Sequence, residues 1–167
     1  MITKIRVVVD YWLSRFLMFL MAISVLNVLW QVFTRFVLKH PSSYTEELAR
    51  FLLIWIGLLG AGYASGKGMH LAIDYFTLKM KPNIQKYIGF FIQLVIFLFA
   101  LTVMVIGGLR LVTITLALNQ TSAALQVKLG YVYSVVPISG VVIMFYAVLT
   151  FFEYLSGNRQ TVTETGE

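Results

Sequence analysis

The residues with the clearest chemical potential form a short charged run, Glu46, Glu47 and Arg50, ahead of a long apolar stretch. Arg50 lies four residues after Glu46 and three after Glu47, so an ion pair across one helical turn is predicted. Ser43 precedes Glu46 by three residues, which is the spacing of a capping box, and carboxylates near a helix N-terminus favour its dipole. We interpret the run as structural, although the same charges could dock a partner.

A second pair, His70 and Asp74, lies in a segment whose polar residues recur at helical spacing among mostly apolar ones. Two ligands are too few for a metal site, and no nucleophile accompanies them. A hydrogen bond on a helix surface is therefore the favoured interpretation. The pattern over 69–82 predicts a short amphipathic helix that lies in the membrane interface.

A polar seam runs along one face of the first apolar stretch and includes Asn27 and Gln31. An unpaired amide facing lipid would be costly, so the seam is expected to face protein. It could line a hydrophilic pathway or form hydrogen bonds between helices. The second reading is favoured because no carboxylate or histidine joins the seam, whose members are Ser24, Asn27, Gln31 and Thr34.

Small residues recur four apart in the second apolar stretch, as Gly57 and Ala61 and again as Gly62 and Gly66. Such pairs let another backbone approach closely in a membrane. They predict packing faces, and the neighbouring helix could belong to this chain or to another.

The elements that position these residues are membrane-spanning helices. The 167 residues are 59 % apolar and only 12 % charged, whereas a soluble domain is typically about a quarter charged. Four stretches can cross a bilayer core of about 30 Å. The fold class predicted is an all-α integral membrane protein, a single domain over 1–156 with a disordered cytoplasmic tail over 157–167. The first stretch is expected to be a retained helix, because no cleavage site follows it. The four spans are placed at about 16–34, 48–65, 88–109 and 131–155.

The distribution of Lys and Arg predicts that both termini face the cytoplasm. With four spans, eight basic residues fall on the side of the termini and four on the other, which the positive-inside rule favours. The first group is Lys4, Arg6, Arg15, Lys67, Lys79, Lys81, Lys86 and Arg159, and the second is Arg35, Lys39, Arg110 and Lys128.

Several classes of function are disfavoured by the composition. The chain has no cysteine, which excludes thiol redox chemistry and thiolate metal sites. Both histidines fall outside the spans, where they could not serve as the axial ligands of a haem-binding anchor. The net charge of +6 comes without the basic, aromatic-rich runs of a nucleic-acid-binding protein. No cofactor is expected in this chain. The hypotheses that remain are an accessory subunit, a stand-alone oligomeric exporter or channel, and a membrane-bound enzyme subunit. The first is favoured because a lone transporter usually needs an ionisable group or broken helices at mid-depth.

Three motifs resemble those of a known family: Tyr44-Thr45-Glu46-Glu47-Leu48-Ala49-Arg50, then Trp55 with Leu59-Gly60-Ala61, then Lys67 through Asp74. A later block, from Ala124-Leu125 through Tyr133, Pro137 and Gly140, resembles the approach to the family's last helix. Over about 40–140 the chain is similar to the small membrane subunit, of the Q or DctQ type, of tripartite ATP-independent periplasmic (TRAP) transporters.

The resemblance implies an inner-membrane complex of bacteria or archaea that imports an organic acid, such as sialic acid or a C4-dicarboxylate, driven by a sodium gradient. A periplasmic binding protein would deliver the substrate, and a large M subunit would hold the substrate and sodium sites. The small subunit would widen the scaffold of M among the phospholipids and help to dock the binding protein. The spacing of Glu46, Glu47 and Arg50, with Arg35 on the preceding helix, predicts a cluster that fixes the hairpin of the first two helices. The resemblance places this cluster near the docking surface, for which Lys39 and Lys128 are candidates.

Overall fold

The computed structural model of the protein describes residues 2–39, 42–67 and 82–155. Within those residues the chain is helical, without a strand, and four helices are long and apolar enough to cross a membrane. The all-α architecture with four spans is therefore confirmed. The elements are α1 (Ile2–Phe36), α2 (Ser43–Gly66), α4 (Pro82–Phe99), the π-helix η1 (Ala100–Gly107), α5 (Gly108–Ala117), α6 (Leu129–Tyr133) and α7 (Val135–Leu155).

The helices that contain two of the predicted spans are longer than those spans. The first apolar helix extends over Ile5–Phe36 and includes Asp10, where the sequence predicted a start near 16. The third continues to Ala117 rather than to 109 and takes in Arg110, whose side chain is exposed. Hydropathy ends a span at the first charged residue, but a helix continues where that charge finds a partner or reaches the membrane surface.

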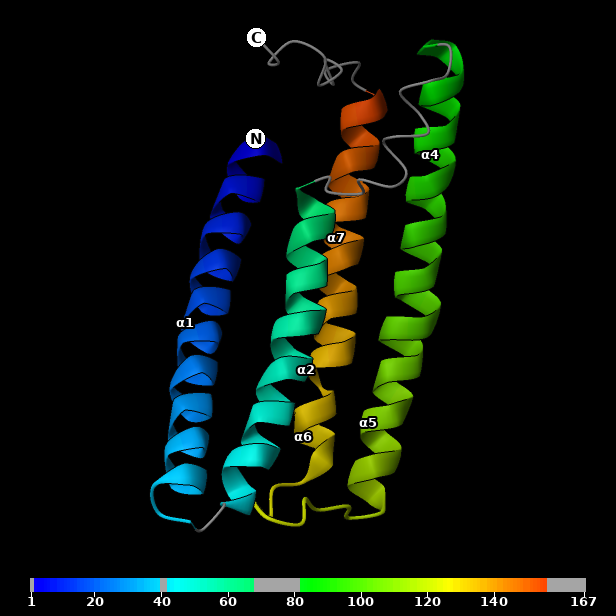
Figure 1. The fold of residues 1–167 in the computed structure, drawn as a ribbon. Coiled ribbons are helices and arrows are strands. Elements are labelled where there is room, and N and C mark those ends of the chain that lie inside the picture. The colour runs from blue at the N-terminus through cyan, green and yellow to red at the C-terminus, as the bar shows by residue number, and fades with distance from the viewer. Residues whose placement is uncertain (1, 40–41, 68–81, 156–167) are drawn as a thin grey trace, which may run out of the picture.

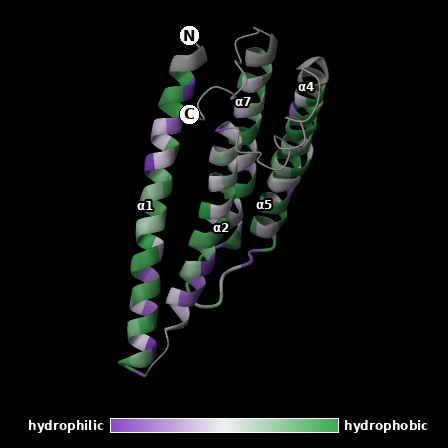
Figure 2. Ribbon diagram, turned by 45° about the horizontal axis from the view of Figure 1, so that its top comes forward, coloured by the Kyte–Doolittle hydropathy of each residue, from purple (hydrophilic) through white to green (hydrophobic). Residues whose placement is uncertain are grey.

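The helices pack in a row rather than around a central axis (Figure 1). The first helix packs mainly against α2, α2 packs against α7, and α7 packs against the third span, formed by α4, η1 and α5. The core cluster joins three of these spans and consists of Leu20, Leu52, Leu59 and Val135. Apolar residues cover most of each span, while hydrophilic residues interrupt α1 and gather where α2 begins (Figure 2).

Glycines bring the third and fourth spans into close contact. A Cβ built on Gly140 would lie 2.7 Å from the Cβ of Met104, and one on Gly108 would lie 2.9 Å from the Cδ of Pro137. These distances are shorter than carbon atoms tolerate without a shift, so only glycine allows this approach. Met104 and Gly108 lie within and just after η1, where the helix is wound more widely than an α-helix.

The fourth span is interrupted at Ser134, between α6 and α7. Pro137 stands three residues later and has no N–H to donate to the carbonyl of Tyr133, so the helix cannot continue regularly there. A proline inside a helix usually produces a kink, and here it accompanies a short break. The side chain of Trp55 stabilises it, because the indole N–H donates to the carbonyl of Val132 at 3.1 Å.

Helix α1 begins and α7 ends at the same end of the bundle, here called the terminal end (Figure 1). The opposite, hairpin end holds the turn between α1 and α2 and the loop between α5 and α6. Which end faces the cytoplasm stays a prediction. The amphipathic helix predicted over 69–82, with His70 and Asp74, falls almost entirely on residues 68–81, outside the described residues. The tail predicted over 157–167 also lies outside them.

Candidate functional site

The polar seam of α1 joins α1 to α2 at the hairpin end. The Asn27 amide N–H donates to the carbonyl of Thr45 at 2.8 Å, and both side chains are buried. Thr45 is only 2 % exposed and shares a 2.6 Å hydrogen bond with the hydroxyl of Ser42. The prediction that Asn27 binds a neighbouring helix is confirmed within this chain. Gln31, one turn further along the seam, lines a polar cavity instead.

The charged residues at the start of α2 make two separate contacts: Glu46 pairs with Arg50, and Glu47 binds a loop. The Arg50 guanidinium lies 3.6 Å from Oε1 of Glu46, which confirms the predicted ion pair, although these side chains are 67 % and 66 % exposed. An ion pair this exposed stabilises a protein by no more than about 1 kcal/mol. The predicted capping box does not form: Ser42, not Ser43, precedes the first helical residue, and it makes no side-chain capping bond.

Glu47 does not pair with Arg50 but accepts hydrogen bonds from a distant loop. Its Oε2 accepts the backbone N–H groups of Ala124 and Leu125, each at 2.9 Å. The carboxylate thereby satisfies two donors in the loop between α5 and α6. This long-range contact could not be read from spacing, because its partners lie 77 and 78 residues away.

The expected hairpin cluster of Arg35 with the three charged residues of α2 does not form. Among the described residues, no carboxylate lies within ion-pair distance of Arg35, whose guanidinium lies over the ring of Phe36 at 5.9 Å. The hairpin is held by Asn27 and Thr45, and by the Trp30 indole, which donates to the Tyr44 hydroxyl at 3.4 Å.

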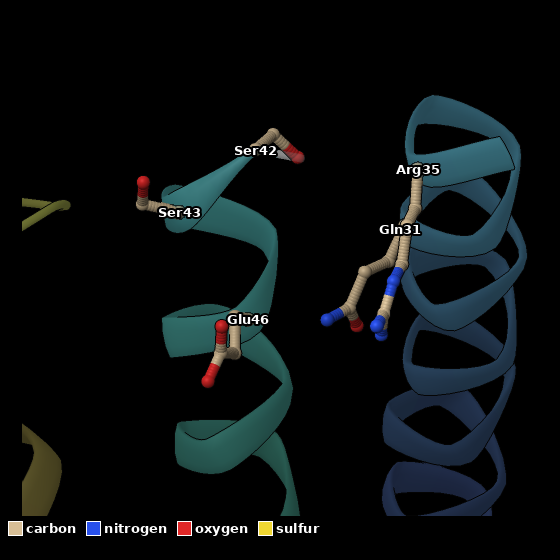
Figure 3. A pocket seen from close by; sticks show the side chains of 5 residues that line it. All are labelled: Gln31, Arg35, Ser42, Ser43 and Glu46. Carbon is tan, nitrogen blue, oxygen red and sulfur yellow. The ribbon is translucent and has the colours of Figure 1, made fainter. Parts of the chain in front are cut away.

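A polar cavity of ≈ 380 Å³ lies beside this hairpin. Arg35 and Gln31 extend from α1 toward α2, and Ser42 turns back toward α1 (Figure 3). Ser43 and Glu46 complete the lining from the first turns of α2. The cavity is thus lined by a guanidinium and an amide of α1 on one side and by a carboxylate and two serines at the start of α2 on the other; Ser42 turns toward α1 and Ser43 points away from it (Figure 3).

The two small-residue pairs of α2 face different surroundings. A Cβ on Gly62 would lie 3.2 Å from Cγ1 of Val142, and one on Gly66 would lie 2.5–2.6 Å from ring atoms of Tyr146, so this pair packs against α7. By contrast, Gly57 and Gly60 have nothing within 4 Å among the described residues. Their side of α2 forms an open stripe, which is exposed apart from the half-buried Gly60 and consists of Glu46, Arg50, Leu53, Gly57, Gly60 and Ala61.

At the terminal end, a polar cluster joins three helices and was not predicted from the sequence. Asp10 of α1 accepts hydrogen bonds from Nζ of Lys67 at 2.8 Å and from the hydroxyl of Tyr146 at 2.5 Å. The Tyr146 side chain is 1 % exposed. Arg6 adds a bond to the carbonyl of Gly66, the residue that makes room for the tyrosine ring. The sequence feature that could have indicated this cluster is Asp10, an acidic residue inside a long apolar helix.

Lys67 stands just beyond the spanning part of α2, at the membrane surface. Its hydrogen bond with Asp10 raises the pKa of the Lys67 ammonium above its ordinary value of 10.5. Because the pKa is raised, the Lys67 ammonium stays charged until the pH exceeds this raised pKa. The bond between Lys67 and Asp10 is therefore intact across the physiological pH range.

The described spans offer no reaction centre. In the ranges 2–39, 42–67 and 82–155, no three histidine, cysteine or acidic residues gather as metal ligands would. Charged side chains do occur inside these spans, among them Asp10 and Arg15 in the first, Arg50 in the second and Arg110 in the third, but no described charged residue stands at the midpoint of a span. Lys39 and Lys128, the predicted docking residues, are exposed at the hairpin end.

Comparison with known proteins matches the sequence of this chain to one family. The family described as "Tripartite ATP-independent periplasmic transporters, DctQ component" matches residues 24–157. The chain is 37 % identical over 67 residues to the sialic acid TRAP transporter permease protein SiaT of Haemophilus influenzae, covering 40 % of this chain and 11 % of that protein. It is 38 % identical over 61 residues to the small permease protein SiaQ of Vibrio cholerae, covering 36 % and 35 %.

A putative TRAP transporter small permease protein of H. influenzae is 30 % identical over 71 residues, covering 42 % of this chain and 44 % of that protein. The aligned segments thus span less than half the length of each of these relatives. The family, in contrast, matches most of the chain, and the matched residues reach into each of the four apolar helices. It consists of transporter subunits rather than enzymes. The chain belongs to the DctQ family, as a small multi-pass permease subunit of a TRAP transporter in the inner membrane.

Proposed function

We propose that this subunit supports a larger membrane subunit of a sodium-driven importer, rather than transporting a substrate itself. The observation that carries the proposal is an open stripe on α2, combined with spans whose described residues place no charge at a midpoint. A lone transporter usually needs charged groups or broken helices at mid-depth. A supporting subunit needs a surface onto which another helix can pack. Sodium ions would be bound by the larger subunit.

The stripe suits a second transmembrane helix better than lipid. Lipid chains adapt to any apolar surface, whereas small residues matter where two backbones approach closely. Gly57 and Ala61 are one turn apart on the exposed side of α2 and leave room for such an approach. At the membrane edge the same stripe carries the Glu46 and Arg50 pair, whose charges can bond with polar groups of the partner.

Relatives support both the partner and the substrate class. The aligned segment makes up only 11 % of SiaT, a permease much longer than this chain, and SiaQ is named a small permease protein. A small subunit related to part of a longer permease is expected to work beside a large one. Both names specify sialic acid, so we take this acid as the first substrate to test and a C4-dicarboxylate as the second.

The hairpin end is the surface that we expect to meet the periplasmic binding protein. This expectation follows from the positive-inside rule, which places the termini in the cytoplasm. Lys39 and Lys128 are exposed there, and Glu47 fixes the backbone of the loop that ends at Lys128. Two free cations beside an ordered loop would attract an acidic surface and speed encounter with it.

Assembly with the large subunit tests the supporting role. Gly57→Leu should fill the open stripe and reduce co-purification of the large subunit without changing the melting temperature of this chain alone. Val141→Leu is the matched control, because Val141 is exposed on a different helix. Normal assembly of the Gly57 variant would show that the stripe faces lipid. Dimers of the chain alone that are lost in this variant would instead favour the alternative, an oligomeric exporter or channel.

Docking is tested separately by reversing the two exposed charges. Lys39→Glu with Lys128→Glu should slow association of the binding protein at low salt, and the difference should shrink as ionic strength rises. Arg15→Glu, in the half of α1 that leads to the terminal end, is the control and should leave association unchanged. If the control slows association and the lysine variants do not, then the hairpin end faces the cytoplasm.

A further inference from the structure

The polar cavity between α1 and α2 is not used by the supporting role. Its ≈ 380 Å³ are lined by Gln31, Arg35, Ser42, Ser43 and Glu46. Other polar groups of the hairpin make hydrogen bonds, whereas the two charged residues of the cavity, Arg35 and Glu46, make few polar contacts. Arg35 has no ion pair among the described residues, and Glu46 has only the exposed contact with Arg50 at 3.6 Å.

The depth of the cavity is marked by two aromatic residues. Trp30 and Tyr44 are exposed and share a hydrogen bond, and each is next in sequence to a residue that lines the cavity: Trp30 precedes Gln31, and Tyr44 follows Ser43. Exposed tryptophan and tyrosine gather at the level of lipid headgroups, where an apolar ring can meet a polar surface. The cavity therefore opens at headgroup depth, where phospholipids are its most abundant neighbours.

The arrangement of charges selects among headgroups. A phosphate fits beside the Arg35 guanidinium, which can donate two parallel hydrogen bonds, with the Ser42 hydroxyl as a further donor. The carboxylate of Glu46 on the facing wall would repel a headgroup that carried only negative charge. It favours a headgroup whose second group is a cation with N–H donors.

We propose that this cavity binds the phosphoethanolamine headgroup of a phospholipid, with the phosphate at Arg35 and the ammonium at Glu46. The ammonium has three N–H donors for a carboxylate, whereas a trimethylated choline has none. Phosphatidylglycerol offers hydroxyls but no cation. The site should therefore prefer phosphatidylethanolamine to either of these lipids.

Native mass spectrometry of the full-length chain, released from nanodiscs of defined composition, measures this preference. With equal amounts of the three lipids, the wild type should retain phosphatidylethanolamine about fivefold better than the others, as expected for one solvent-exposed ion pair. Arg35→Gln should lower retention of phosphatidylethanolamine by a similar factor. Glu46→Gln should still bind lipid but lose the preference for ethanolamine over choline.

The control is Arg15→Gln, which removes an exposed cation from the other half of α1, where Arg15 lies over the ring of Tyr11. It should leave both retention and preference unchanged. All three substitutions are at exposed residues, and unchanged melting temperatures in detergent would show that the variants fold. Equal retention of the three lipids by the wild type, or wild-type retention by Arg35→Gln, would overturn the proposal.

Discussion

Adding a single methyl group at Gly66 should show experimentally that this side of α2 is packed, whereas the open stripe is not. In Gly66→Ala, the new Cβ would lie 2.5–2.6 Å from three ring atoms of Tyr146, about 1 Å closer than carbon atoms pack. The ring cannot retreat freely, because its hydroxyl is bonded to Oδ1 of Asp10. Either the helices separate or this hydrogen bond breaks.

The expected loss of stability follows from three contributions. Overpacking typically costs about 1–3 kcal/mol. Loss of the hydrogen bond to the Asp10 carboxylate adds about 1.5–3 kcal/mol. The better helix propensity of alanine returns less than the roughly 0.5–1 kcal/mol of a helix interior, because Gly66 is the last residue of α2. The net destabilisation is about 2–5 kcal/mol, and at about 2–4 °C per kcal/mol for a chain of this size the melting temperature should fall by at least about 4 °C.

Thermal unfolding in detergent, followed by intrinsic fluorescence, measures the change. Gly57→Ala is the matched control, because it adds the same methyl group to the same helix where nothing lies within 4 Å. It should melt at or slightly above the wild-type temperature. If Gly66→Ala melts like the wild type, or if both variants fall equally, the packing of α2 on α7 described here is wrong.

Four further substitutions test the polar contacts. Tyr146→Phe and Asp10→Asn should each lower stability, and the double variant should lose less than the sum, because both remove one hydrogen bond. Asn27→Leu should cost about 0.6–2 kcal/mol in the unfolding free energy, as expected for a bond between membrane helices. Glu47→Ala should leave α2 folded but increase hydrogen exchange at the amides of Ala124 and Leu125; unchanged exchange would show that Glu47 does not hold the loop.

The four spans could be predicted because hydropathy reports how much of a helix is apolar, and lipid imposes that requirement locally. The ends of the spans could not be predicted equally well. Asp10 lies inside α1 because Lys67 and Tyr146, from two other helices, satisfy its carboxylate. A distant partner of this kind leaves no mark in the sequence around Asp10.

The same limit applies to the site residues. The spacing of Glu46 and Arg50 predicted their ion pair, because both lie on one helix. Glu47 has nearly the same local surroundings, yet it binds the loop between α5 and α6. The pairs that begin at Gly57 and Gly62 are also alike in sequence, and only the position of α7 makes one packed and the other open. Local spacing determines contacts within a helix, whereas contacts between helices depend on how the helices are arranged.

The central claim, that this subunit supports transport without performing it, is tested most directly by reconstitution. Proteoliposomes would contain the chain alone, the large subunit alone, or both, with an inward sodium gradient, the binding protein and radiolabelled sialic acid outside. The account predicts uptake only when both membrane subunits are present. Sodium-dependent uptake into vesicles that contain this chain alone would contradict it.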